Sequence, residues 1–520
     1  MNGQLGEIRL VAFNFIPKNY VLCDGRRFKK RNEFNHATDL YEVVGDAYTY
    51  DNSDPTTFAI PDLRNRFVLG AEKETDLGVK KGKDEIVLSL NQMPEHNHET
   101  RIDVDNTNGG EEPRNLPNNS YLNNKAGVFS TEPSENTYLG GISQKNVGKS
   151  SPINIKNAHV KMVYVMCIKN DPREGFIGEI KIWPNTKKNI NLKGHIPLGW
   201  RLCDGDVLRE GSENDVLFAV IGYRFGGNIA RRQFNLPDFR NRFAVGVKDD
   251  ENVGKSGGKT AIRLDKNQLP HHTHDVKLAV NNDSDSTPHV QIPNNAFINS
   301  NAGVFSEEIS SLSNLGGIQE ENKGANEEVD ITNSSLGLNF IICTHGAHPS
   351  KIGSTLGEII LFAGNNLNDT SSFSTCSGQS FPINTNQSLF SLLGTFYGGD
   401  GRIKFNLPNL NDKIPLCISH LDEVGRNEGA NTIKLTPDNL PEHNHNVQLA
   451  TNHTASGTKV NISNGILNKD AGMFSTKASE STYLAGVKEG GFIGDDIDIR
   501  NPFLNIHYLI CTEGNYPSKA

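Results

Sequence analysis

The sequence predicts a mainly β protein with short helices, of the α+β class, in which three tandem repeats close into a single-chain pseudo-trimer. The first observation is self-similarity over nearly all of the 520 residues. The second is a Pro-x-His-x-His motif that returns once in each repeat, far beyond the roughly 20–50 residue period of a solenoid. The third is the predominance of short apolar segments between Gly- and Asn-rich turns, which is typical of strands.

Five shared motifs define the repeat. In chain order they are a Gly-Glu-Ile strand start, a Cys-x-Gly turn, a segment of the type Phe-x-apolar-Pro, the histidine motif and an Ala-Gly-x-Phe-Ser segment. They stand at residues 6–8, 23–25, 58–66, 94–98 and 126–130 in the first repeat, at 178–180, 203–205, 234–242, 270–274 and 302–306 in the second, and at 357–359, 376–378, 405–413, 441–445 and 471–475 in the third. Because the order is kept, we expect one fold in all three repeats.

We predict domains at residues 1–170, 171–346 and 347–520. The boundaries fall in short polar segments punctuated by Pro and Gly, at 170–175 and 346–351. Linkers this short hold consecutive repeats side by side and favour a closed threefold arrangement. The alternative is a string of separate domains, since about ten extended residues reach roughly 30 Å.

Within a repeat, the apolar pattern predicts a strand, a short helix and a closing strand. Segment 358–363 is expected to be a strand that ends before Gly364, and segment 386–393 has the spacing of a short helix that stops at Gly394. Segment 506–511 is expected to be a buried strand. The Asn-, Gly- and Ser-rich stretches after each histidine motif, such as 106–125, are predicted to be exposed turns and loops.

Composition and charge exclude several function classes. The hydrophobic content of 35% and charged content of 22% are ordinary for a soluble globular protein, and the net charge of -9 argues against nucleic-acid binding. No apolar run approaches the roughly 20 residues that span a bilayer. Neither a basic nor an apolar segment follows Met1, so we expect synthesis in the cytoplasm without a signal peptide. No nucleophile elbow or catalytic carboxylate pair can be placed, and we predict no enzyme.

The histidine motifs are the candidate metal ligands. In an extended segment the two histidines of His-x-His project from the same face, with Cα atoms roughly 6.8 Å apart. Three such pairs around a threefold axis offer six nitrogen ligands to one ion. The predicted ligands are His96, His98, His272, His274, His443 and His445. The alternatives are histidines that lie on the surface and three separate metal sites.

Six imidazoles also predict the metal and its role. An octahedral nitrogen set suits Fe(II), Ni(II) or Co(II) better than Zn(II), which usually takes four ligands. We therefore expect one structural transition metal, with Fe(II) favoured and Zn(II) as the second choice. Since no coordination position stays open for water or substrate, the metal would clamp the repeats and not catalyse. Glu95, Glu442 and His271 are candidate outer-shell partners or, equally, solvated side chains.

The seven cysteines allow two interpretations. Six of them stand at matching positions of the repeats, namely Cys23 and Cys167, Cys203 and Cys343, and Cys376 and Cys511, whereas Cys417 is extra. Each pair would form a disulfide between the first turn and the last strand, or each thiol would be a small buried apolar group. The second interpretation is favoured, because free cysteine is among the most buried residue types and cytoplasmic synthesis disfavours disulfides.

With these motifs, each repeat resembles the phage tail collar and microcystin-dependent protein family. The family pattern is a Gly-Glu-Ile strand, a Trp-x-Leu-Cys-Asp-Gly turn, a helix followed by Tyr-Gly-Gly, a Leu-Pro-Asp-Leu-Arg-Gly-Arg segment, a His-x-His motif and a closing apolar strand. Residues 199–205 and 397–401 match it closely. The third repeat departs from it with Ser377 in the turn and with Asn411 and Lys413 in place of both arginines.

The resemblance implies a structural function. Collar domains occur in trimeric short tail fibres of contractile phages, where His-x-His pairs from three chains are expected to meet at a metal on the axis; here one chain carries all three. We therefore expect a tail-fibre or baseplate-tip protein of a phage tail or a tail-like contractile injection particle, located in the virion or extracellular particle.

Its partners would be other tail, baseplate or fibre proteins and a cell-surface receptor such as a glycan, which the variable loops after the histidine motifs would contact. One alternative is a secreted adhesin or self-assembling extracellular fibre subunit. Another, which requires an open coordination position on the metal, is a redox or hydrolytic metalloenzyme.

Overall fold

The structure is a computed structural model. It describes residues 3–30, 36–51, 53–94, 96, 100–102, 104–105, 121–123, 129–130, 142–144, 147–169, 175–184, 196–211, 213–247, 250–265, 268–269, 272, 274, 276–278, 280–281, 297–299, 305–306, 318–320, 324–325, 327–346, 354–364, 372–441, 443, 445, 447–449, 466–467, 474–475, 487–489 and 495–519.

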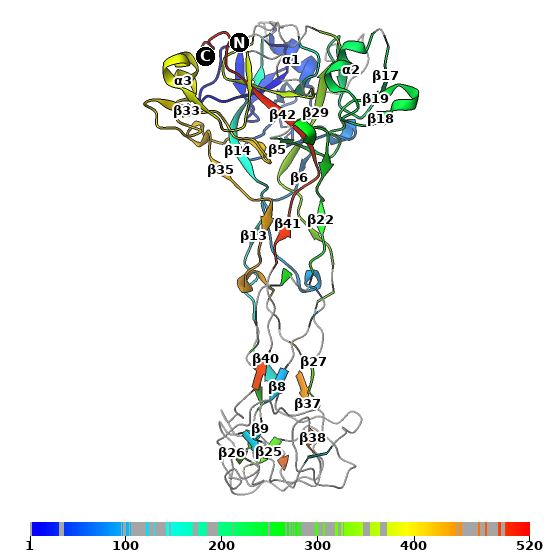
Figure 1. The fold of residues 1–520 in the computed structure, drawn as a ribbon, viewed down its shortest axis with the longest axis vertical. Coiled ribbons are helices and arrows are strands. Elements are labelled where there is room, and N and C mark those ends of the chain that lie inside the picture. Colours follow the sequence, from blue (N-terminus) through cyan, green and yellow to red (C-terminus); the bar gives the residue numbers. More distant parts are fainter. Residues whose placement is uncertain are drawn as a thin grey trace.

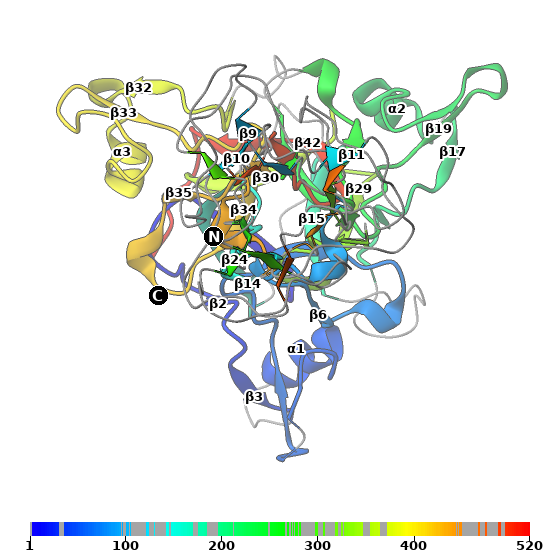
Figure 2. The ribbon, with the colours of Figure 1, turned by 90° about the horizontal axis from the view of Figure 1, so that it is seen from below.

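The molecule has a broad head, a narrow shaft and a distal end (Figure 1). The head carries both ends of the chain and the three α-helices of the described part, α1 (His36–Val44), α2 (Asp215–Ile221) and α3 (Gln387–Leu393). Seen from below, three arms extend around the long axis, and each arm carries one of these helices (Figure 2). The described part is mostly β with short helices, so the predicted fold class is confirmed.

The helices form where the sequence places apolar residues at helical spacing. In α3, Leu389, Leu392 and Leu393 are buried on one face, and the helix ends at Gly394, whose φ of +50° suits a residue without a Cβ. α2 ends in the same way at Gly222. The short helix and its stop, predicted for the third repeat, are confirmed.

The head is built on a 15-stranded sheet in which each repeat pairs its opening strand with its own closing strand. The opening strands also pair with one another at the axis. The opening strands are β1 (Ile8–Val11), β15 (Glu179–Trp183) and β30 (Glu358–Phe362). The closing strands are β14 (His159–Cys167), β29 (Ser335–Cys343) and β42 (Phe503–Cys511), and the predicted buried strand at the end of the chain is confirmed.

The repeats exchange one strand each, and the exchange runs in a closed cycle. The exchanged strands are β5 (Phe67–Gly70), β20 (Phe243–Gly246) and β34 (Ile414–Cys417). β5 of the first repeat pairs in parallel with β29 of the second, β20 of the second with β42 of the third, and β34 of the third with β14 of the first. One hydrophobic cluster accordingly includes buried residues from all three repeats. The repeats thus share a core, although each is long enough to bury one of its own.

The shaft continues this arrangement with short strand pairs. Near the head, each repeat pairs two of its own strands, namely β7 (Glu85–Ile86) with β13 (Ile153–Asn154), β22 (Ala261–Ile262) with β28 (Val329–Asp330), and β36 (Thr432–Ile433) with β41 (Ile497–Asp498). Further down, the pairs join different repeats, namely β8 (Thr100–Ile102) with β40 (Val487–Glu489), β12 (Ile142–Gln144) with β23 (Val276–Leu278), and β27 (Ile318–Glu320) with β37 (Val447–Leu449). Apolar residues from all three repeats fill the shaft interior in two clusters.

Three buried asparagines close a hydrogen-bonded ring where the shaft meets the head. The backbone N–H of Asn157 donates to Oδ1 of Asn333 (2.7 Å), that of Asn333 to Asn501 (2.9 Å), and that of Asn501 to Asn157 (3.0 Å). Each Nδ2 also donates over 2.8 Å to a backbone carbonyl, of Ile499, Ile155 and Ile331 respectively. All three side chains are at most 3% exposed, so the ring ties the repeats together where water cannot replace its bonds.

Replacing Asn333 with Ala is expected to lower the free energy of unfolding by about 2–4 kcal/mol. The change leaves the buried N–H of Asn157 without its acceptor and the carbonyl of Ile155 without its donor. The matched control is Asn154→Ala, which removes an exposed amide of the same shaft and should cost less than about 0.5 kcal/mol. Thermal and urea unfolding of both variants measure the difference. Equal losses would show that the ring adds no stability.

Charged side chains are buried at the axis of the head. Three glutamates, each at most 1% exposed, stand at matching positions of the opening strands: Glu7, Glu179 and Glu358. Arg9 forms ion pairs with Glu7 and with Glu358. Its Nη1 lies 2.9 Å from Oε1 of Glu358. Lys181 Nζ lies 2.7 Å from Oε2 of Glu7. The third repeat has the apolar Ile360 at the position that these two cations occupy in the first and second repeats.

The arginines that the third repeat lacks are structural in the first two. Arg64 and Arg66 pair with Asp62 of their own turn, and Arg240 and Arg242 pair with Asp238 in the same way. In the third repeat the matching residues are Asn409, Asn411 and Lys413. The carboxylate and both guanidinium groups are thus replaced together, and no cation of this turn is left facing a missing carboxylate partner.

All seven cysteines are free thiols and all are buried, so the interpretation as small buried groups is confirmed. Three of them bond to the backbone two residues further along, at the end of each closing strand; these are Cys167, Cys343 and Cys511. Burial raises the pKa of Cys167 to about 11 and that of Cys417 to about 12. The thiols are therefore protonated and unreactive at neutral pH.

Alkylation under native conditions is expected to leave the cysteines unmodified, and alkylation in denaturant without reductant is expected to label all seven. Mass spectrometry of the labelled chain gives the count. Labelling that reaches completion only after reduction would indicate disulfides and contradict the structure.

The distal end carries short strands where exposed loops were expected. Residues Tyr121–Asn123 form β10, which pairs with β9 (Val104–Asp105) and β26 (Phe305–Ser306). The other described residues within 100–144, 276–320 and 447–489 also lie in such short strands. The expectation of loops is therefore wrong at these positions, because pairing between repeats supplies the backbone hydrogen bonds. Most of residues 106–125 lies outside the described residues. Within the described ranges, no helix has the length and apolar character needed to cross a membrane.

Candidate metal centre

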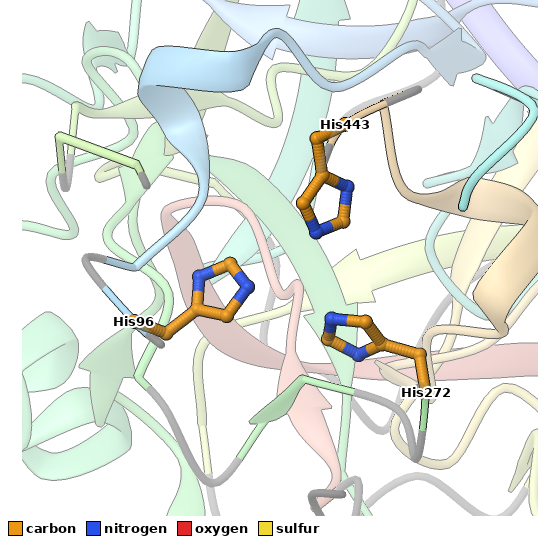
Figure 3. Close-up of side chains that lie close together, drawn as sticks. All are labelled: His96, His272 and His443. Carbon is orange, nitrogen blue, oxygen red and sulfur yellow. The ribbon is translucent and has the colours of Figure 1, made fainter. Parts of the chain in front are cut away.

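Three histidines, one from each repeat, meet inside the shaft. The structure brings together His96, His272 and His443, whose ring centroids form a nearly equilateral triangle with sides of 5.4, 5.4 and 5.3 Å. The three rings converge on one point (Figure 3). All three are at most 4% exposed, so the expectation of surface histidines is wrong for these residues.

The second histidines of two motifs form the next layer. His274 and His445 are also buried, with ring centroids 5.0 Å apart. Within one motif the rings are 5.6 Å apart in the His272–His274 pair and 5.5 Å in the His443–His445 pair, so both members face the same interior, as the His-x-His spacing predicts. The ring centroids of His96 and His445 are 4.8 Å apart. His98, the sixth predicted ligand, lies outside the described residues.

Each described ring has neighbours on several sides at nearly equal distance. Around His443, four rings lie at 5.4, 5.3, 4.8 and 5.5 Å. A corner of an octahedron has four such neighbours and one opposite corner. The five described imidazoles therefore lie at five corners of a distorted octahedron.

Hydrogen bonds set the orientation of the rings. In His96 and His443, Nδ1 lies 2.8 and 2.9 Å from the carbonyl oxygens of Pro94 and Pro441. A carbonyl oxygen only accepts, so Nδ1 carries the proton and Nε2 keeps its lone pair. In the described part, Nε2 of His443 is buried without a hydrogen-bond partner. Burial lowers the pKa of His443, which favours the neutral imidazole that can act as a ligand.

The histidine segments are held by the returning segments of other repeats. His443 exchanges two backbone hydrogen bonds of 2.9 Å with Val147. Next to Val147, Gly148 has a φ of +101°, and a Cβ on it would lie 2.3 Å from the carbonyl oxygen of Pro441. Likewise, Gly324 has a φ of +97°, and a Cβ on it would lie 2.3 Å from the carbonyl oxygen of Pro94. The close approach of these backbones therefore requires glycine at both positions.

This arrangement can hold a metal ion. The ligand atoms of His96, His272 and His443 all lie within 4.8 Å of one another, and so do those of His274, His443 and His445. Neighbouring nitrogens on an octahedral ion with bonds of about 2.1 Å lie about 3.0 Å apart, so the rings would move inward by up to about 1 Å to bind one ion. The proposed outer-shell residues Glu95, Glu442 and His271 lie outside the described residues, and the acceptors that the structure reveals are backbone carbonyls.

Comparison with protein families identifies the head. The family model of the phage tail collar domain matches residues 6–68, 178–244 and 357–415. Neither a search of curated proteins nor a search of solved structures returned a match. Each match ends before the histidine motif, so the metal centre rests on its own geometry. The collar domain is a structural domain of tail fibres and not an enzyme family, which indicates a structural component of a phage virion with other tail proteins as partners. The chain thus carries three tandem regions that match the phage tail collar domain, one in each repeat.

Proposed function

We propose that this chain is a single-chain pseudo-trimer at the tip of a phage tail fibre or baseplate, or of a tail-like contractile injection particle, where it attaches the particle to a cell surface. The observation that carries the proposal is the convergence of His96, His272 and His443 from three collar repeats onto one point of the shaft.

The pseudo-trimer interpretation is supported by the cyclic exchange of strands. Each repeat, at residues 1–170, 171–346 and 347–520, gives a strand to the next, and the third returns one to the first. The Asn157–Asn333–Asn501 ring repeats this symmetry in a second place. A cycle of this kind needs three repeats at one axis and has no counterpart in a string of domains.

The metal in this proposal is a clamp. His98 completes the octahedron, and six imidazoles bind one transition metal, with Fe(II) favoured over Zn(II) by the coordination number. The ligands come from three repeats, so the bound ion stabilises the shaft against separation. A saturated ion has no position for a substrate, which makes a metalloenzyme the weaker interpretation.

Attachment is assigned to the distal end. The head is the broad end of the molecule, and the narrow shaft leads away from it to the distal end (Figure 1). Other tail or baseplate proteins would bind the head, and a receptor such as a glycan would meet the distal end.

Electron microscopy of particles labelled with an antibody against the chain tests this function. We expect label at the tail or fibre tip, and we expect the purified chain to block adsorption of the particle to cells. Label on isolated extracellular fibres, with no effect on particle adsorption, would instead support a secreted adhesin or fibre subunit.

A further inference from the structure

A cavity of about 250 Å³ lies at the junction of shaft and head, lined mainly by the third repeat together with Val245 of the second and Asn157 of the first. We call it the junction pocket. From the third repeat it is lined by Asp412 just before β34, Ile414 on β34, Arg500 between β41 and β42, and Phe503 and Asn505 on β42. Drug-sized ligands occupy cavities of roughly 300–1,000 Å³, so this one suits a ligand of a single ring.

Divergence of the third repeat opens the pocket. By strand register, Ile414 on β34 matches Phe67 on β5 and Phe243 on β20. At the matching position of the first repeat, the Phe67 ring packs against His159 with centroids 5.6 Å apart. The third repeat has the smaller Ile414 there; it packs in one cluster with Phe67 and Phe243, and its outer side lines the cavity.

The polar groups of the pocket include several that the fold does not use. Asp412 has a φ of +55°, like its counterparts Asn65 and Asn241, but Asn241 donates to Glu72, whereas the Asp412 carboxylate has no hydrogen bond in the described part. The side-chain amide of Asn505 also has no hydrogen bond in the described part. Arg500 binds Asp498 through Nε and Nη2, which leaves Nη1 for a ligand. The pocket thus offers an acceptor, a donor and an amide beside the Phe503 ring.

Charge selects among small polar ligands. The charged residues of the lining are Asp412 and Arg500, so the pocket has no excess charge of either sign to match a charged ligand. The Arg500 guanidinium carbon lies over the Phe503 ring, 5.8 Å from its centroid, and covers part of that ring. A neutral polyhydroxyl ring satisfies the carboxylate and the amide with its hydroxyl groups beside these two side chains.

We propose that the junction pocket binds one neutral sugar ring, a hexose or N-acetylhexosamine, as a subsite for a cell-surface glycan. The inference deepens the proposed attachment function and rests on it for its biological role, but binding itself requires neither the metal nor a particle. It places a glycan contact at the base of the head, in addition to the distal end.

The test is ligand-observed NMR titration of the purified full chain with methyl glucoside, methyl galactoside, methyl N-acetylglucosaminide and N-acetylneuraminic acid. We expect saturable binding of at least one neutral glycoside and none of the acidic sugar. The decisive variants give the third repeat the residues of its siblings: Ile414→Phe, which fills the cavity, should abolish binding, and Asp412→Asn should weaken it about tenfold. Asp422→Asn, at an exposed carboxylate elsewhere in the repeat, should change nothing.

Both variants place a residue that two matching positions already hold, so they are expected to fold, and melting curves verify this. Absence of saturable binding, binding that survives Ile414→Phe, or preference for the acidic sugar would overturn the inference. None of these outcomes alters the location of the chain in the particle, so failure here is distinct from failure of the proposed function.

Discussion

Replacement of Arg9 by Met is expected to lower the free energy of unfolding by about 3–5 kcal/mol, since it leaves buried carboxylates with one cation fewer. Burial disfavours the charge of Arg9, but the carboxylates of Glu358 and Glu7 outweigh it and hold the pKa of Arg9 above its ordinary value. Methionine fills a similar volume without a charge. The loss would therefore measure the ion pairs at the axis and not a cavity.

The matched control for Arg9 is Arg26→Met. Arg26 pairs with Asp24 over 2.7 Å, but its side chain is 47% exposed, and surface pairs contribute only about 0–1 kcal/mol. Thermal unfolding of both variants at low and high salt gives the comparison, and only the Arg26 pair should respond to salt. If the two variants have the same melting temperature, the buried cluster does not hold the repeats at the axis.

The variant His443→Ala is expected to lose the bound metal and with it the stabilisation that the metal confers. For free metal about 1,000-fold above the dissociation constant, that stabilisation is about 4 kcal/mol. His443 has the most complete set of described ring neighbours, so no other single change removes as much of the site. The melting temperature of the variant should no longer respond to a chelator, whereas that of the unaltered chain should fall.

His345→Ala is the control for this prediction, because His345 is an exposed histidine of the head. It should keep both the metal and the chelator response. A His443 variant that retains metal and melts like the control would remove His443 from the ligand set.

The clustering of the described histidines follows from a constraint that is local and periodic. His-x-His in an extended segment fixes two rings on one face, and its return in three repeats indicates convergence. The helix at Gln387–Leu393 follows from apolar spacing and a terminal glycine for the same reason. The asparagine ring had a comparable signal that went unused, an Ile-x-Asn motif at 155–157, 331–333 and 499–501.

Other features depend on contacts between repeats that no local pattern encodes. The parallel pairing of β34 with β14 joins the third repeat to the first, and nothing in either segment specifies its partner. The carbonyls of Pro94 and Pro441 orient the rings through the backbone, which has the same chemistry in every residue. The junction pocket arises from a difference between repeats, at Ile414, and comparison of motifs emphasises what repeats share.

The most direct measurement is the metal content of the purified chain after exhaustive dialysis, determined by elemental analysis together with the protein concentration. Convergence of the histidines on a common ion predicts about one transition-metal ion per chain. A content near zero, with a melting temperature that a chelator leaves unchanged, would contradict it.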